Sequence, residues 1–389
     1  MSRKLLLYSY DWAPLVGGVQ TVMMDLALGI CAWSKAHPED SWEVVLATQT
    51  PAAGMDDTKL PFAVVRQPSL LRLIRLMIAA DIVHLAAPTA LPLLVAQVLR
   101  RRLCIEHHGF QASCPNGLLF FEPTRTPCPG HFMARRYTKC IECNRGVTGS
   151  LGAILLLMKT KARRWLSNWA AVNIVPTEWL GTVLQLKNQI TVHHGVAVPD
   201  EDPPGTRVPP VIAYQGRLVS TKGVDVLLAA AEQLQNEGIE FCLRIIGEGP
   251  EGPALDRQAR RLREGTVSFL GHVPPERFKE ALEGVSIIVV PSLGGEVFGL
   301  VVAESMLRCK ALVISDIGAL TEVAGESGVV TKTGSPASLA DALRHLVLNP
   351  EAVTKSGRQG RERAARFFRV DEMVKKHLAI YEGLARGHR

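Results

Sequence analysis

The sequence predicts an α/β protein made of two doubly wound, Rossmann-like parallel domains that face a central cleft. In both halves of the 389-residue chain, short apolar segments of strand composition alternate with helical patterns. Residues 198–210 join the halves and hold five prolines in 13 positions, which is the composition of an exposed linker. At roughly 150 residues per domain, the length also favours two domains, which we place at 1–204 and 205–367.

The first half begins with a strand over residues 4–9 and a turn at Gly17-Gly18, from which a helical pattern runs over 19–33. The elements expected after it are strands at 42–48, 62–66, 82–85 and 103–106 and a helix at 93–99. Residues 110–150 break this alternation with four cysteines and little periodicity. They predict an irregular insertion in the first domain.

The second half repeats the alternation. Its expected strands cover 211–214, 242–246, 286–290 and 312–315, and its expected helices cover 224–234, 255–263 and 298–306. Two such domains leave a cleft at the carboxyl ends of their strands, where ligands of open α/β sheets bind.

The composition is that of a globular protein, since 47% of the residues are apolar, 21% are charged and the mean hydropathy is +0.13. These values exclude a disordered or fibrous chain. No apolar run approaches the roughly 18 residues of a membrane-spanning helix, and polar Ser9 and Asp11 come too early for a signal peptide. We therefore expect a cytoplasmic protein whose eight cysteines are reduced thiols or metal ligands.

The net charge of +7 lies in the first half, because residues 201–389 hold 24 basic and 24 acidic side chains. Residues 100–164 alone carry 12 Lys or Arg against 3 Asp or Glu. Such an excess indicates an anionic partner, namely a membrane surface, a phosphate-bearing acceptor or a nucleic acid. Few aromatic residues alternate with these cations, which argues against nucleic acid.

Two cations follow the expected strand at 211–214. Gly216 opens a turn, Arg217 comes directly after it, and Lys222 follows five residues later, just before the next helix. A diphosphate needs point charges of this kind beside a backbone that it can approach closely. The alternative is a surface loop with two solvated cations.

Glu296 lies just before the expected start of a helix, and Glu304 follows eight residues later. If the helix begins near Val297, its free N–H groups favour an anion, and Glu304 lies roughly 12 Å along the axis from Glu296. Carboxylates of a glycosidase are about 5–10 Å apart, so this pair better suits hydroxyls on different parts of one elongated ligand. The alternative is a capping Glu296 and a Glu304 paired with a basic neighbour.

Together these segments carry a resemblance. In order and spacing, GRL, KG, IIGEGP, FLGHVP, VVPS and the two glutamates resemble the nucleotide-sugar domain of retaining family 4 glycosyltransferases, which have the GT-B fold. The resemblance is strong over about residues 205–345 and weaker at Gly17-Gly18. It implies that the segment 368–389 is a helix that returns to the first domain.

The resemblance also implies residue roles. Arg217 and Lys222 would hold the donor diphosphate, and Glu304 the ribose hydroxyls. Glu296 and the backbone after it would contact the transferred sugar and its phosphate. The remaining donor-binding positions are glycines and the residues that follow Glu296: Gly17, Gly18, Gly216, Val297, Phe298, Gly299 and Leu300.

The resemblance bears on three further segments. The family usually has glycine and proline where this chain has Cys309 and Ala311, so we expect an altered turn rather than lost chemistry. A first-domain histidine lies near the sugar in the family; His107 in IEHHGF is the closer match and His108 the alternative. The pair at 193–194 is expected to be structural.

The cysteines at 110–150 suggest a metal. Cys140 and Cys143 have the spacing of a zinc knuckle, and Cys114 and Cys128 could complete a four-thiolate site. A subset of the family carries a similar insertion. Four thiolates leave no open coordination position, so this zinc would be structural, and we expect catalysis to need no cofactor. The alternative is a set of reduced thiols that pack a loop.

The resemblance therefore implies a retaining, metal-independent glycosyltransferase, which we expect to move a sugar from a UDP- or GDP-sugar to a lipid-linked or polysaccharide acceptor in cell-envelope or exopolysaccharide synthesis. The alternatives are a dinucleotide-dependent oxidoreductase or epimerase and a zinc-knuckle nucleic-acid-binding protein. The oxidoreductase is less favoured because GEGPEG at 247–252 matches the dinucleotide fingerprint but does not follow the first strand of its domain.

A membrane surface is the last expected partner. The apolar residues 151–158 are followed by four cations and two tryptophans: Lys159, Lys161, Arg163, Arg164, Trp165 and Trp169. This composition is typical of a helix that lies on a membrane surface. We expect peripheral attachment to the inner face of the membrane; the alternative is a solvated helix beside the cleft.

Overall fold

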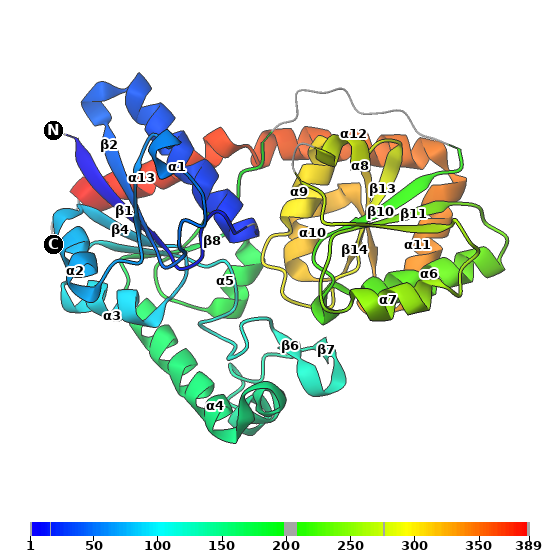
Figure 1. Ribbon diagram of the computed structural model, residues 1–389, viewed down its shortest axis with the longest axis horizontal. Helices are drawn as coiled ribbons and strands as arrows, with labels where there is room; N and C mark the ends of the chain where they lie inside the picture. Colours follow the sequence, from blue (N-terminus) through cyan, green and yellow to red (C-terminus); the bar gives the residue numbers. More distant parts are fainter. Residues whose placement is uncertain (1, 16, 198–207, 275–276, 387–389) are drawn as a thin grey trace. The chain divides into compact units, whose positions relative to one another are not determined.

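The structure is a computed structural model that describes residues 2–15, 17–197, 208–274 and 277–386 (Figure 1). It divides into two compact units. Unit 1 comprises Met1–Leu118, Pro129–Val196 and Phe368–Arg389, and unit 2 comprises Leu119–Cys128 and Ala197–Phe367. Of the linker predicted at 198–210, all but the last three residues lie outside the described part of the chain.

Unit 1 is built on a parallel sheet of seven strands in the order β3-β2-β1-β4-β5-β8-β9. The strands are β1 (Arg3–Ser9), β2 (Trp42–Thr48), β3 (Ala63–Arg66), β4 (Ile82–Leu85), β5 (Leu103–Glu106), β8 (Val172–Val175) and β9 (Gln189–Thr191). The helices are α1 (Gly18–Ala36), α2 (Leu70–Ala79), α3 (Ala90–Val98), α4 (Tyr137–Ser167), α5 (Glu178–Leu184) and α13 (Val370–Arg386). Every residue of β4, β5 and β8 is buried, as expected for strands covered on both faces.

Unit 2 has a six-stranded parallel sheet in the order β12-β11-β10-β13-β14-β15. The strands are β10 (Val211–Gln215), β11 (Cys242–Ile246), β12 (Val267–Gly271), β13 (Val285–Val290), β14 (Ala311–Ser315) and β15 (Gly328–Thr331). The helices are α6 (Val224–Asn236), α7 (Gly252–Ala259), α8 (Phe278–Ala281), α9 (Leu300–Leu307), α10 (Gly318–Ala324), α11 (Pro336–Leu348) and α12 (Pro350–Phe367). The strand order reverses between β10 and β13. The predicted fold class, two doubly wound α/β domains, is confirmed.

The insertion predicted at 110–150 differs from its expected form. Its irregular part ends at residue 136, because α4 begins at Tyr137 and continues past the range, with a break at Gly149. Within the irregular part, β6 (Phe120–Phe121) and β7 (Thr126–Pro127) form a short hairpin. The hairpin groups with unit 2, where Arg125 lies 3.5 Å from Glu251, whereas the rest of the insertion groups with unit 1.

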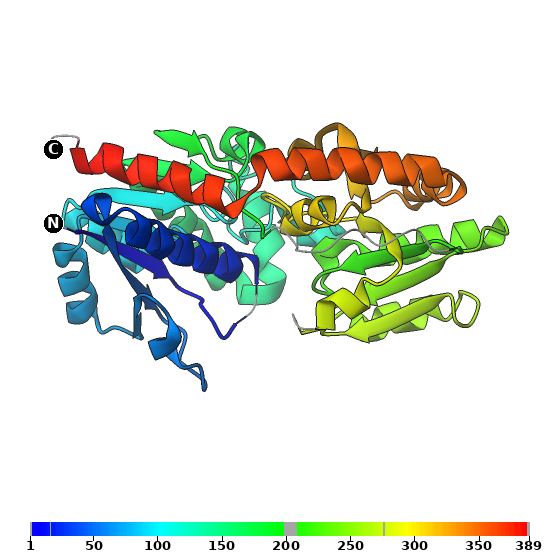
Figure 2. The same cartoon turned by 90° about the horizontal axis from the view of Figure 1, so that it is seen from above.

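The last helix, α13, packs in unit 1 along α1 (Figure 2). The contact is close because Gly29 of α1 has no side chain; a Cβ there would lie 2.4 Å from Val374 Cγ2. None of the helices in the described ranges has the length and apolar character that crossing a bilayer requires.

Candidate functional site

Two loops of unit 2 meet beside the point at which the strand order reverses. Residues 216–223 follow β10, and residues 291–299 follow β13. The Leu293 N–H donates to the Thr221 carbonyl at 2.7 Å, and a Cβ on Gly223 would lie 2.0 Å from the Pro291 carbonyl oxygen. Gly223 also has a φ of 65°, which glycine adopts without strain. Because ligands of doubly wound sheets bind at this switch point, the two loops form the candidate site.

The loops bring Lys222 and Glu296 together, although they are 74 residues apart. Lys222 Nζ donates to Glu296 Oε1 at 2.6 Å, and Ser292 Oγ donates to the same oxygen at 2.7 Å. The Lys222 and Glu296 side chains are 29% and 10% exposed. The carboxylate is therefore oriented by two donors, while the ammonium remains accessible to a ligand.

Arg217 adds a second cation to the same loop. Its backbone is held by the Tyr214 hydroxyl, which donates to the Arg217 carbonyl at 2.8 Å. Its side chain is exposed, and the guanidinium makes no hydrogen bond or ion pair with any described residue. One cation paired with Glu296 and one solvated cation thus face solvent from one loop, an arrangement that suits an anionic ligand.

The predicted helical relation between Glu296 and Glu304 is wrong. α9 begins at Leu300 rather than near Val297, because Gly299 precedes it with a left-handed φ of 85°. Val297 and Phe298 therefore lie in the loop, and the free N–H groups of the helix start after Gly299. Glu304, on α9, accepts a hydrogen bond of 3.4 Å from Gln215 at the end of β10.

The turn after α9 carries the departure at Cys309. Its φ is 51°, in the left-handed region that glycine commonly occupies after a helix. The expected altered turn is therefore not observed: Cys309 keeps a glycine-type conformation at the cost of backbone strain, and the loops in front of α9 keep their contacts.

His107 and His108 of unit 1 lie in different surroundings. The His107 ring is fully buried, and its Nε2 donates to Asn173 Oδ1 at 2.9 Å. Burial lowers the pKa of His107 to about 4, against the opposing effect of the Asn173 bond. The His107 ring is closed off in this conformation, so its contact with a sugar stays a prediction. Gly17 and Gly18 also lie in unit 1, at the start of α1.

His108 belongs to a buried cluster that the sequence did not suggest. Four histidines surround the fully buried carboxylate of Glu106: His84, His108, His194 and His377. Although burial pushes the pKa of Glu106 up, its interactions with the histidines pull it well below its usual value. Burial also lowers the pKa of His84 and that of His194, the latter to about 3.

The cysteines of the predicted zinc site are not arranged as one ligand set. Cys114, Cys140 and Cys143 are buried in unit 1, whereas Cys128 groups with unit 2. Asn116 lies between two of them: it accepts from Cys114 Sγ at 2.9 Å and donates to Cys143 Sγ at 3.5 Å. Among the described residues, three metal-binding side chains with ligand atoms within 4.8 Å of one another occur only around Glu106. The three thiols of unit 1, those of Cys114, Cys140 and Cys143, therefore do not form a ligand set by themselves, and the four-thiolate zinc stays a prediction.

The second half of α4 exposes an apolar stripe, which we call the α4 stripe. Its residues have the spacing of one helix face and are at least 43% exposed: Leu151, Ile154, Leu155, Met158, Trp165 and Trp169, the last just beyond the helix end. Of the nearby cations, Lys159 is exposed, but Arg164 donates to the Leu184 and Gln185 carbonyls and Lys161 lies over the Tyr137 ring.

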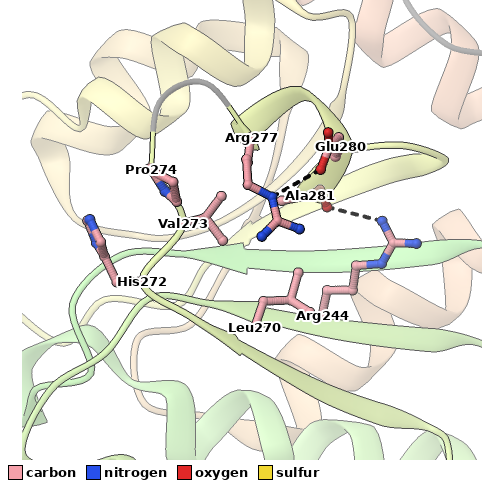
Figure 3. Close-up of a pocket in the computed structure, with 8 residues that line it drawn as sticks. All are labelled: Arg244, Leu270, His272, Val273, Pro274, Arg277, Glu280 and Ala281. Atoms are coloured by element: carbon pink, nitrogen blue, oxygen red, sulfur yellow. Dashed lines mark hydrogen bonds and ion pairs between the residues drawn. The ribbon is translucent and has the colours of Figure 1, made fainter.

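Unit 2 also contains a pocket of about 360 Å³ between β11, β12 and α8 (Figure 3). It is lined by Arg244, Leu270, His272, Val273, Pro274, Arg277, Glu280 and Ala281. Arg277 pairs with Glu280 at 3.2 Å. None of the predicted donor-site residues lines this pocket, so it is separate from the loops described above.

Residues 209–349 match the family described as glycosyl transferases group 1, a span that contains both loops of the site. The glycogen synthase of Mycobacterium tuberculosis (strain CDC 1551 / Oshkosh) is 32% identical over 184 residues, 46% of this chain and 44% of that protein. The chain therefore matches less than half the length of this relative. These matches support the predicted family for residues 209–349, at the level of group 1 glycosyltransferases.

Solved structures match over nearly the whole chain. Sucrose-phosphate synthase from Thermosynechococcus elongatus has a TM-score of 0.73 at 18% identity, over 98% of this chain and 99% of that one. HepE from Anabaena, solved in complex with UDP and glucose, has a TM-score of 0.70 at 15% identity, over 98% and 100%. At these identities the likeness shows the fold, which is GT-B as predicted.

Proposed function

We propose that the chain is a retaining glycosyltransferase that moves a sugar from a UDP- or GDP-sugar to a lipid-linked or polysaccharide acceptor in cell-envelope or exopolysaccharide synthesis. The observation that carries the proposal is the contact of Lys222 with Glu296 at the switch point of unit 2, with Arg217 exposed in the same loop. The family match of this unit supports the reaction class, and the UDP and glucose bound by HepE support the donor class.

The geometry suggests how each residue acts. Lys222 and Arg217 neutralise the donor diphosphate, and the start of α9 adds partial positive charge as the bond to the sugar breaks. These groups stabilise the leaving diphosphate without a metal ion. Glu296, oriented by Ser292, contacts a hydroxyl of the transferred sugar, and Glu304 contacts the ribose. No covalent nucleophile is assigned, so the acceptor attacks from the face that the diphosphate leaves.

The acceptor side is proposed to meet a membrane. The α4 stripe offers apolar and aromatic side chains to solvent, in a segment with a large excess of positive charge. Such a helix binds the interface of an anionic bilayer with its apolar face in the acyl boundary. A lipid-linked acceptor would be presented at this surface, on the inner face of the membrane.

A thermal-shift screen of the full chain tests the proposed donor class. UDP, GDP, NAD and a mixed-sequence oligonucleotide are added separately. A nucleoside diphosphate at 100 times its Kd should stabilise the fold by about 2.7 kcal/mol. Stabilisation by UDP or GDP supports the glycosyltransferase; stabilisation by NAD or the oligonucleotide alone, or by none of the four, contradicts it.

A further inference from the structure

The strongest unassigned feature of the molecule is the carboxylate of Glu106, buried in unit 1 among imidazoles. Glu106 ends β5, His84 lies on β4, and His377 lies on α13; all three side chains are fully buried. The geometry points to a divalent metal ion of the zinc class, bound by His84 Nε2, His377 Nε2 and Glu106 Oε2. Nothing in the proposed transfer reaction uses these residues.

The separations of the three ligand atoms fit a metal ion. His84 Nε2 and His377 Nε2 lie 3.1 and 3.3 Å from Glu106 Oε2, and all three atoms lie within 4.8 Å of one another. In a tetrahedral zinc site with bonds of about 2.0–2.1 Å, neighbouring ligand atoms are about 3.3 Å apart. The His84 contact lacks hydrogen-bond alignment despite its short distance.

The proton position on His377 strengthens this assignment. His377 Nδ1 lies 2.9 Å from the Met373 carbonyl, which can only accept a hydrogen bond, so Nδ1 carries the proton. Nε2 lies 3.3 Å from Glu106 Oε2, so that contact needs either a second proton on the ring or a cation, because without one Nε2 presents a lone pair to the lone pairs of Oε2. A cation between the two atoms removes this repulsion. A histidine that binds a metal commonly donates its other N–H to a carbonyl in this way.

The other oxygen of Glu106, Oε1, also faces two imidazole nitrogens. Oε1 lies 3.7 Å from His108 Nε2 and 3.5 Å from His194 Nδ1, which form a second group of metal-binding geometry. Oε1 and His108 Nε2 have no hydrogen-bond partner among the described residues. We assign the ion to the group of His84, Glu106 and His377. Its contacts are shorter, and the hydrogen bond to the Met373 carbonyl shows that the proton of His377 is on Nδ1. An ion there would cross-link α13 to the strands of the first half of the chain.

Metal analysis of the full chain tests the proposal. Untagged protein is produced in zinc-supplemented medium and purified without chelator, and its metal content is measured by mass spectrometry. We expect about one zinc per chain in the unaltered protein and in the double variant Cys140→Ser/Cys143→Ser, and less than about a tenth in His377→Gln and His84→Gln. The cysteine variant is the matched control, because it removes the rival thiolate ligands.

A cobalt spectrum keeps the test decisive if the histidine variants fail to fold. The unaltered chain, produced with Co²⁺ in place of zinc, should show visible ligand-field bands without an intense near-ultraviolet thiolate charge-transfer band. Two results would overturn the proposal: unaltered protein with less than about a tenth of a metal ion per chain, or metal that is lost in the cysteine variant and shows a thiolate band. If the unaltered protein lacks metal, a proton between His377 Nε2 and Glu106 Oε2 accounts for their contact instead.

Discussion

At the residue scale, Lys222 contacts Glu296, whereas the proposed reaction also requires Lys222 to bind the donor diphosphate. A diphosphate needs the lysine charge, yet Glu296 already accepts a hydrogen bond from that lysine at 2.6 Å. Ser292 donates to the same carboxylate oxygen, so Glu296 keeps one donor when Lys222 turns toward a ligand. In the proposed reaction, the carboxylate is thus oriented for a sugar hydroxyl while the lysine binds the diphosphate.

We therefore predict that a change at Glu296 lowers the rate of transfer without weakening donor binding. In Glu296→Gln, Ser292 keeps a hydrogen-bond acceptor, but the negative charge beside the diphosphate is gone. We expect the Kd for UDP or GDP to stay equal or fall, while turnover falls at least about 100-fold, as for a lost transition-state contact. Calorimetry and a donor-turnover assay measure the two effects.

The control for this prediction is Glu322→Gln, a glutamate on α10 outside the two loops. Glu296→Ala should also abolish transfer while the circular dichroism spectrum stays unchanged. A Glu296 variant that retained most of its turnover would remove this residue from the mechanism.

Cys309 carries a second prediction at this scale. A residue with a Cβ at a φ of 51° is strained, whereas glycine is not. Cys309→Gly should therefore raise the free energy of unfolding by about 0.5–1 kcal/mol in urea denaturation. Cys309→Ala, which loses the thiol but keeps the Cβ, should show no gain. Equal effects of both variants would mean that the thiol, rather than the backbone, determines stability here.

At the scale of elements, the start of α9 shows how one glycine redefines a site. Its sequence pattern predicts a helix from Phe298, because apolar residues continue through that position. Gly299 adopts a left-handed conformation instead, and a Cβ there would lie 2.6 Å from Leu320 Cδ2. Glu296 is therefore placed by the loop and can reach Lys222. The sequence pattern of apolar residues does not predict this left-handed glycine, because glycine also occurs within helices.

The α4 stripe leads to a prediction on membrane binding. Sedimentation with vesicles should show binding that requires anionic lipid and falls with salt, because apolar insertion and charge act together. Leu151→Ser/Leu155→Ser/Met158→Ser should abolish it, and Lys159→Gln should weaken it. Lys161 and Arg164 are left unchanged because they contact Tyr137 and the Leu184 carbonyl.

Leu348→Ser, a substitution at an exposed leucine that ends α11 in unit 2, is the matched control for the vesicle experiment. It should bind vesicles as the unaltered chain does. If the unaltered protein ignores anionic vesicles at low salt, the membrane proposal fails and a soluble acceptor replaces it.

At the scale of the whole molecule, most strands of the two parallel sheets were predictable because they are apolar runs, whereas β8, β9, β12 and β15 were not expected. The expected bounds 42–48, 82–85, 103–106 and 242–246 coincide with β2, β4, β5 and β11. Helix ends were less predictable, since they depend on caps. α7 begins three residues before its expected start, with Pro253 in its first turn, and α9 begins two residues late after Gly299.

The loops that carry Lys222 and Glu296 could be predicted from the sequence, whereas the Glu106 cluster could not. These residues lie in loops that directly follow predicted strands: Arg217 and Lys222 after β10, and Glu296 after β13. Parallel neighbouring strands bring such loops to the same edge of the sheet. The Glu106 cluster comes from four separated segments, so no spacing rule relates His84 to His377. The cysteine spacing predicted a metal site in the insertion instead, because spacing does not show that the Asn116 side chain contacts the thiols of Cys114 and Cys143.

The measurement that tests the account most directly is the affinity of the full chain for UDP and GDP by calorimetry. Lys222→Ala should weaken binding of the preferred nucleotide by about 1.5–3 kcal/mol, roughly 10- to 150-fold in Kd, as expected for one charge-assisted contact. Arg260→Ala, at an exposed cation just beyond α7, should leave the Kd unchanged. An unaltered protein that binds neither nucleotide, or a Lys222→Ala variant that binds as tightly as the original, would contradict the assignment of this loop to a donor diphosphate.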